Sequence, residues 1–146
     1  MVKIWRTVTQ CAVVLLAVLA AGACRRPPTA TPPKNEPPFG VVDGPANGAT
    51  VGREVEFSGW ALDDSRVAEV RIYVDGQFKV SAKVKIPRPD VTKVYPRYAT
   101  PGDIHGWWEL VDLGDRGGEH TLLAQAVDDR GATGDIGPIK VRLIER

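Results

Sequence analysis

The stretch VRIYVDGQFKVSAKV, residues 70–84, decides the fold class of this chain. Its first half places Val70, Ile72 and Val74 on alternate positions, which is the period-two pattern of a half-buried β-strand. Asp75-Gly76 follows at once, and this dipeptide between two alternating runs is a strong hairpin signal. The second half alternates again up to residue 84. The stretch therefore predicts two antiparallel strands joined by a tight turn.

The same kind of pattern recurs on both sides of this hairpin. Short apolar runs near residues 55–62, 108–110, 122–126 and 139–143 are separated by Gly, Asp and Pro turns. No window after the N-terminal leader shows a sustained helical period. We therefore expect an all-β fold over residues 39–146, a single antiparallel sandwich of about seven strands.

The N-terminus reads as an export signal. Lys3 and Arg6 precede an apolar run over residues 11–23, which ends in small side chains before Cys24. The segment resembles a bacterial lipoprotein signal peptide, although Ala21 stands where that family usually has Leu. An ordinary secretory signal and an uncleaved anchor are the alternatives, but the run is shorter than the about 20 apolar residues of a membrane span.

The lipoprotein resemblance implies that residues 1–23 are removed and that Cys24 carries a covalent lipid. We then expect the protein at the cell envelope, held on the membrane by lipid. Asp after the Cys commonly retains such proteins in the inner membrane, and Arg25 stands there instead. The resemblance therefore implies the outer membrane if the organism has two membranes.

Residues 24–38 predict a linker. Six of the fourteen residues from Arg25 to Pro38 are proline, so the segment should be extended and should not bury a core. Removing Lys3 and Arg6 with the leader leaves 17 basic residues against 18 acidic ones. A nearly neutral surface gives no reason to expect nucleic acid as a partner.

Several motifs resemble the bacterial immunoglobulin-like (Ig-like) domains of cell-surface and secreted proteins. The similarity extends over nearly all of residues 40–145. The motifs that carry it are VDGP (42–45), GATV (48–51), GWALDD (59–64), PRPDV (87–91), YPRY (95–98), EHTL (119–122) and AVDDRG (126–131). The resemblance implies a sandwich fold and a surface setting, and it implies no activity.

The segment 86–104 is long for a connection in a sandwich, and it contains four prolines and two tyrosines. One interpretation is a recognition loop that binds a partner through Arg88, Asp90, Tyr95 and Tyr98. The other is structural: the tyrosines pack on the sandwich, and Arg88 and Asp90 tie the loop down by an ion pair or backbone bonds.

Two further sets of side chains could bind ligands. In a period-two strand, Trp107 and Trp108 face opposite ways; we assign Trp108 to the core and expect Trp107, with Glu109, to be exposed for stacking on sugars. Paired acids could hold Ca²⁺, but acids in turns usually cap backbone amides, and we expect no metal or other cofactor. The acids are Asp63, Asp64, Asp128 and Asp129.

No sequence motif announces a reaction. His105 and His120 are the only histidines, and no nucleophile elbow, HExxH or paired CxxC occurs. The leading hypothesis is a non-catalytic envelope lipoprotein that displays one Ig-like domain to a protein partner. A carbohydrate-binding module that uses Trp107 and the proline-rich loop is the alternative, and a small envelope hydrolase is the least favoured.

Overall fold

The computed structural model describes residues 34–144, and residues 1–33 and 145–146 lie outside that description. The predicted signal peptide and the lipid site at Cys24 fall outside the described residues and stay predictions. Within the described range, no helix has the length and apolar character needed to cross a membrane.

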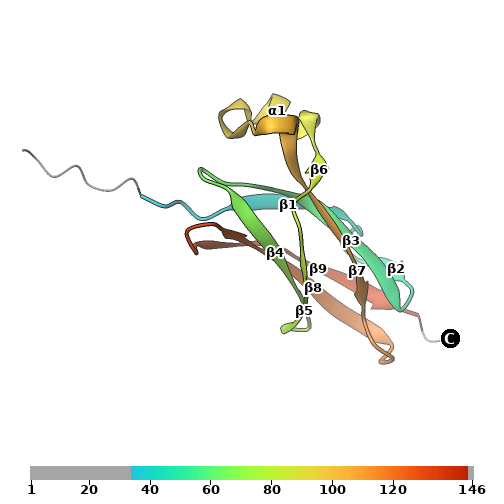
Figure 1. The fold of residues 1–146 in the computed structure, drawn as a ribbon. Coiled ribbons are helices and arrows are strands. Elements are labelled where there is room, and N and C mark those ends of the chain that lie inside the picture. The colour runs from blue at the N-terminus through green and yellow to red at the C-terminus, as the bar shows by residue number, and fades with distance from the viewer. Residues whose placement is uncertain (1–33, 145–146) are drawn as a thin grey trace, which may run out of the picture. The chain divides into compact units, whose positions relative to one another are not determined.

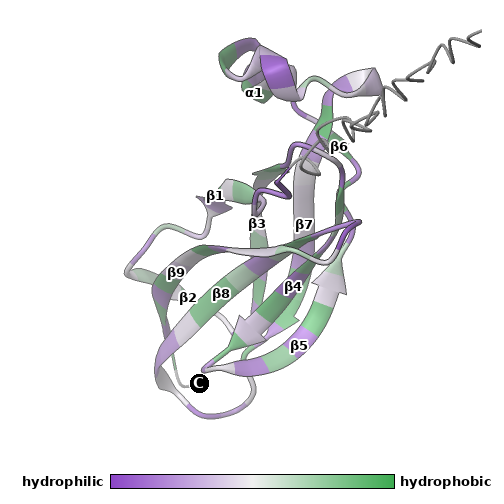
Figure 2. Cartoon of the chain, turned by 90° about the vertical axis from the view of Figure 1, so that its left-hand side faces the viewer, coloured by the Kyte–Doolittle hydropathy of each residue, from purple (hydrophilic) through white to green (hydrophobic). Residues whose placement is uncertain are grey.

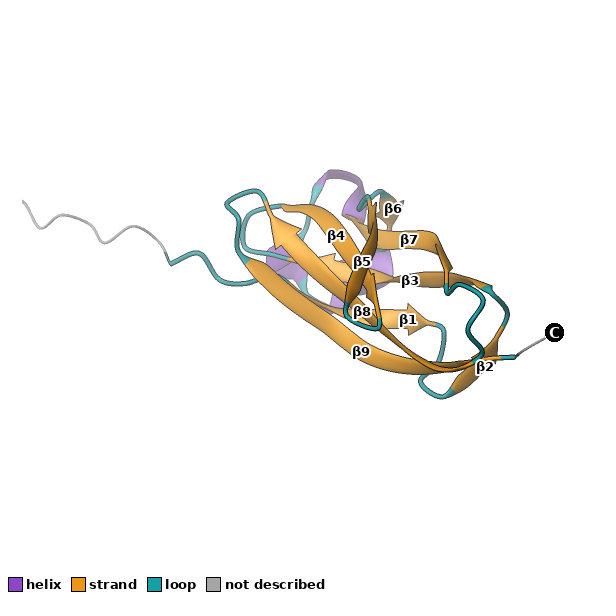
Figure 3. Cartoon of the chain, turned by 90° about the horizontal axis from the view of Figure 1, so that it is seen from below, coloured by secondary structure: helices purple, strands orange, loops and turns teal. Residues whose placement is uncertain are grey.

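Nine strands form two sheets stacked face to face (Figures 1 and 3). The four-stranded sheet has the order β1-β3-β7-β6, with β1 (Phe39–Gly44), β3 (Glu54–Leu62), β7 (Ile104–Asp112) and β6 (Ile86–Pro87). The five-stranded sheet has the order β2-β9-β8-β4-β5, with β2 (Ala49–Val51), β9 (Thr133–Leu143), β8 (Gly118–Asp128), β4 (Val67–Val74) and β5 (Gln77–Ala82).

The predicted all-β sandwich is confirmed. All neighbouring strands are antiparallel except β2, which runs parallel to β9. Because β1 belongs to the four-stranded sheet and β2 to the five-stranded one, the chain crosses between the sheets after β1. Beyond the expected seven strands, the structure has the short β2 and β6, which contain three and two residues.

The hairpin predicted from residues 70–84 is also present. Val74 pairs with Gln77, so Asp75 and Gly76 are the two loop residues between β4 and β5. Both have positive φ, 51° and 78°, which is the conformation that matches the twist of a two-residue hairpin. Asp tolerates this region better than most residues, and Gly enters it freely.

The core lies between the two sheets and is built from the alternating apolar positions. Figure 2 shows this alternation as green and purple bands along β4 and β5. The largest side chains that are almost fully buried are Trp107, Phe57, Leu62, Ile72, Leu122, Ile136, Val70, Val111 and Val141. Pro38, which we assigned to the linker, is also buried, and its carbonyl lies against Gly134 of β9.

The segment 86–104 is partly helical, where the sequence predicts only a loop. It contains β6, the helix α1 (Pro89–Val94) and two single 3₁₀ turns, η1 (Pro96–Tyr98) and η2 (Pro101–Asp103). Each of the three begins with a proline, whose fixed φ suits the first turn of a helix and whose missing N–H is not needed there. In η2, Gly102 and Asp103 then have positive φ, 76° and 53°, so this element is a tight turn and not a helix. In Figure 1, α1 and the adjoining turns stand at one end of the sandwich, above β6.

Candidate functional site

Arg88 fastens the segment 86–104 to the four-stranded sheet. Its Nε and Nη2 donate to the two carboxylate oxygens of Asp90, at 2.9 Å and 2.7 Å, and its Nη1 pairs with Asp43 of β1. Its aliphatic stem lies beside Gly106 of β7, where a side chain would leave it no room. The hydrogen bonds from Arg88 lower the pKa of Asp90 to about 2, and those from Asp90 raise the pKa of Arg88.

Two further contacts hold the segment 86–104, one within the segment and one to β7. The N–H of Arg88 donates to the carbonyl of Asp103 at 2.7 Å, which closes the base of the segment. His105 is 2% exposed, and its Nε2 lies 3.0 Å from Oγ1 of Thr92 on α1. Burial lowers the pKa of His105, because desolvation disfavours the charged ring. The segment is therefore closed at its base and attached to β7 through Thr92.

The two tyrosines pack on the sheet, as the structural interpretation of the segment predicts. The ring of Tyr98 meets Phe39 edge-on at a centroid distance of 5.3 Å, and Tyr95 lies 5.6 Å from Trp60. Trp60 belongs to the outer side of the sheet, and this cluster covers it. Beside the tyrosines, Phe39 and Val94 help to line a shallow groove of about 480 Å³.

The assignment of the two tryptophans was wrong. Trp107 is fully buried, and Trp108 is 41% exposed. The cross-strand register explains this: Trp107 lies opposite Gly59, so its ring fills the space above a residue without a side chain and meets Phe57 edge-on at 5.2 Å. Glu109 pairs with Phe57 and so points to the same inner side, half-buried.

The register also defines an apolar outer face on the four-stranded sheet. Trp108 lies opposite Ser58 and Leu110 opposite Glu56, while Val41 of β1 lies opposite Trp60. Val41, Trp108 and Leu110 are 47%, 41% and 51% exposed. We call these three residues the outer face. The ammonium of Lys85 lies over Trp108, 5.8 Å from the ring centroid.

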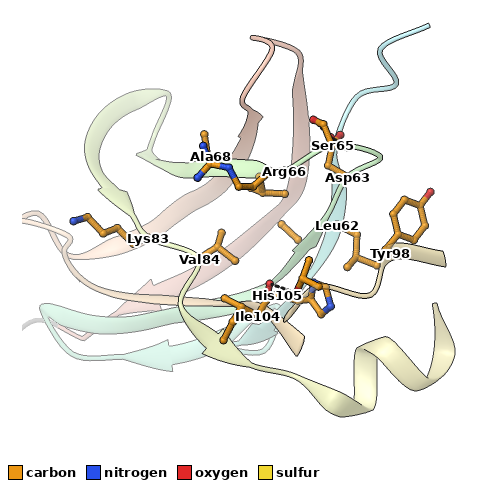
Figure 4. A pocket seen from close by; sticks show the side chains of 13 residues that line it. Leu62, Asp63, Ser65, Arg66, Ala68, Lys83, Val84, Tyr98, Ile104 and His105 are labelled. Carbon is orange, nitrogen blue, oxygen red and sulfur yellow. Dashed lines mark hydrogen bonds between the residues drawn. The ribbon is translucent and has the colours of Figure 1, made fainter. Parts of the chain in front are cut away.

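A cleft of about 360 Å³ opens at the same end of the sandwich as α1 (Figure 4). Leu62, Val84 and Ile104 supply apolar walls, and Arg66 and Lys83 bring two cations to one side. Its size is at the lower end of the range for small-molecule sites, about 300–1,000 Å³. Oγ of Ser65, also at the cleft, donates to Asp63 at 2.6 Å.

The acids proposed as weak Ca²⁺ ligands serve the turns that contain them. Asp63 accepts from the N–H of Ser65, and Asp128 accepts from the N–H groups of Arg130 and Ala132. Asp64 and Asp129 form long ion pairs with arginines, each at 3.7 Å. Within residues 34–144, no three His, Cys, Asp or Glu side chains are grouped so that they could hold a metal ion.

The described residues show no arrangement of a nucleophile with a base and an orienting acid. His105 bonds to Thr92, and His120 bonds to Asp75 and to the carbonyl of Arg116. What the four-stranded sheet offers instead is a fixed surface of apolar side chains. Sequence reasoning did not place Val41 and Leu110 on the outer face. Their position follows from the pairing register of the strands, and the periodicity of the sequence does not give that register.

Comparison with known proteins agrees with this fold. Residues 38–95 match the family described as bacterial Ig domain. The match covers β1 to α1, and with the strand arrangement it supports an Ig-like domain. No curated protein matches the chain.

Among solved structures, the fibronectin(III)-like modules of CbhA from Clostridium thermocellum have a similar fold. The TM-score is 0.50 at 16% sequence identity, over 71% of this chain and 93% of the other. At this identity the likeness shows the sandwich fold alone.

Proposed function

We propose that this chain is a lipid-anchored protein of the cell envelope whose Ig-like domain is a non-catalytic module for protein interaction. The observation that supports this most is the outer face. Monomeric surfaces usually carry scattered single apolar residues, whereas Val41, Trp108 and Leu110 occupy one side of one sheet. Phe39 and Val94 extend the apolar surface toward the segment 86–104.

The rigidity of this surface supports binding by a preformed site. The outer face belongs to paired strands, and the adjoining segment is held by Arg88, Asp90 and Asp43. A surface that is already ordered loses little conformational entropy when a partner binds. The sandwich thus suits display of a constant surface better than a reaction that needs moving parts.

The anchor is proposed from the sequence. A leader that ends at Cys24 and a proline-rich segment after it would place the domain away from the bilayer on an extended spacer. One acyl chain binds membranes only marginally, so stable attachment needs more than one chain, as lipoproteins of this type carry.

Fractionation of cells tests the anchor. The wild-type chain should sediment with membranes and incorporate labelled palmitate, and Cys24→Ser should move it to the soluble envelope fraction without label. Cys11→Ser is the matched control, because that thiol lies inside the leader. Membrane retention of the wild type without acyl labelling would overturn the lipoprotein proposal.

Site-specific photo-crosslinking tests the module. A photoreactive residue at position 108 or 110 should give a discrete protein adduct in intact cells. The same residue at position 78 is the control, because Phe78 is 56% exposed on the other sheet. Binding to a glycan array that is lost in Trp108→Ala, together with no protein adduct, would favour the carbohydrate-binding alternative and contradict the proposal.

A further inference from the structure

Strand β7 has an unpaired edge. On one side it pairs with β3 along its length, from Glu54↔Asp112 to Trp60↔Gly106. On the other side its neighbour is β6, which pairs with it only through Ile86 and Pro87. Among the described residues, no strand therefore pairs with the part of β7 from 107 to 112 on that side, although β5 of the other sheet lies close to β7.

Two backbone hydrogen bonds show which residues of β7 direct their backbone N–H and C=O groups to the open side. The N–H of Lys85 donates to the carbonyl of Gly106 on the β6 side, and the N–H of Leu113 donates to Arg53 on the β3 side. Backbone groups alternate between the two sides of an antiparallel strand. Hence Trp108 and Leu110, like Gly106, direct their N–H and C=O groups to the open edge.

These same two residues belong to the outer face. An added strand would gain hydrogen bonds from their backbone groups and apolar contact with their exposed side chains. A row of unpaired N–H and C=O groups is satisfied by an extended polypeptide, which joins the sheet as a further strand. The geometry thus specifies the conformation of the occupant as well as its position.

The charges along the edge indicate which charged side chains the added strand should carry. At one end Lys85 lies over Trp108, and at the other Asp112 pairs with Arg53 at 3.0 Å and lies near Lys79 of β5. Between them, Glu109 points to the inner side and makes no ion pair within the described residues. Charged residues that point inward on an edge strand also discourage pairing of identical edges. A strand with a basic residue opposite Glu109 would instead complement it.

We propose that the edge of β7 from 107 to 112 accepts an extended segment of a partner protein, in which apolar residues alternate with basic ones. The apolar side chains lie against Trp108 and Leu110, and a Lys or Arg faces Glu109. This inference rests on the proposed interaction function and names the class of partner. It depends on the edge alone and not on the lipid anchor.

Peptide binding to the full-length protein in detergent tests the proposal. A short peptide that alternates Val with Arg should bind, and a peptide that alternates Val with Glu should bind about tenfold more weakly or less. Amide hydrogen exchange should slow at Trp108 and Leu110 when the first peptide binds. Protection elsewhere, or equal binding of the two peptides, would overturn the proposal.

Variants at position 110 separate backbone pairing from side-chain contact. Leu110→Pro removes an N–H that points away from β3, so the fold tolerates it as edge strands do, and it should weaken binding about tenfold. Leu110→Thr keeps the N–H and should weaken binding less. If Leu110→Pro does not fold, Glu109→Lys decides instead, because it should reverse the preference between the two peptides.

Two results would contradict the inference without touching the anchor. One is full binding by Leu110→Pro. The other is a concentration-dependent dimer that Leu110→Pro abolishes, because the occupant would then be a second copy of this chain. In cells, Leu110→Pro should still sediment with membranes as the wild type does. A loss of peptide binding with unchanged membrane association is then distinct from a failure of the proposed envelope location.

Discussion

The indole ring of Trp107 lies over Gly59, its partner across the β3–β7 ladder. A Cβ at residue 59 would come 2.8 Å from Cζ2 of Trp107 and closer still to the carbonyl of Val41. The two strands and the ring therefore fit together only because residue 59 has no side chain. Because this contact places Trp107 on the inner side, the alternation of β7 places Trp108 and Leu110 on the outer face.

We expect Gly59→Ala to lower the free energy of unfolding by about 1–3 kcal/mol, the usual cost of overpacking. Urea denaturation of the purified chain measures it. Gly52→Ala is the control, since a Cβ there would have its nearest neighbour, the Glu54 carbonyl, 4.0 Å away. Equal stability of the two variants would show that the ring does not occupy the space over residue 59.

Replacement of the two tryptophans should have opposite consequences. Trp107→Ala removes a fully buried ring and should cost about 3–5 kcal/mol of unfolding free energy, whereas Trp108→Ala should change it by less than about 1 kcal/mol. Trp108→Ala should instead reduce crosslinking or peptide binding at the outer face. Comparable destabilisation by both substitutions would contradict the assignment of the inner and outer sides.

The strands were predictable from the sequence because their signals are local. Alternation in residues 70–84 and the Asp75-Gly76 turn need no knowledge of the rest of the chain, and the structure has both. The sides of β7 were not predictable in this way. A half-buried Glu109 at an inner position is acceptable because it lies beside an open edge, and that edge exists only because β6 is two residues long.

The segment 86–104 shows a second limit. Its prolines indicate a break in the sheet, but the same residues also begin the helix α1 and the turns η1 and η2. The tie between Arg88 and Asp90 could be foreseen because the two residues are close in sequence. The bond from Arg88 to Asp43 could not, since it depends on how β1 and β6 lie across one sheet.

The ion pair between Arg88 and Asp90 should be visible in an acid titration. Its hydrogen bonds lower the pKa of Asp90 to about 2, below the ordinary value of 3.8. Because the folded value is the lower one, the contribution to stability is complete above pH 4 and is lost as the pH falls toward 2. NMR titration of the Asp90 carboxyl should give the low value in the wild type.

Arg88→Met should return the pKa of Asp90 close to its ordinary value, because the guanidinium that stabilises the carboxylate is gone. It should also release the segment 86–104, so amide exchange should rise at Thr92. Arg97→Met is the matched control, since Arg97 is 69% exposed and pairs with Glu36. A pKa of Asp90 that stays at about 2 in Arg88→Met would show that another group holds it there.

At the far end of the sandwich, Asp75 joins the hairpin turn to β8. Its Oδ1 accepts from the N–H of Thr121 at 2.9 Å, and its Oδ2 lies 2.8 Å from Nδ1 of the buried His120. Burial by itself would raise the pKa of Asp75, but these bonds outweigh it and lower the pKa below its ordinary value. The carboxylate thus stabilises the folded chain above the unfolded pKa, and this stabilisation fades as the pH falls through the folded one.

Asp75→Asn isolates this effect, because Asn adopts the positive φ of the turn as readily as Asp. At neutral pH we expect a loss of about 1–2 kcal/mol, which is reduced from the value of a fully buried charged hydrogen bond since about a third of the side chain is exposed. The difference from the wild type should shrink as the pH falls below 4. Asp115→Asn, at a side chain that is 86% exposed, is the control. A deficit in Asp75→Asn that is constant from neutral to acid pH would contradict the role of the charge, because the charged and the neutral carboxyl would then serve the turn equally well.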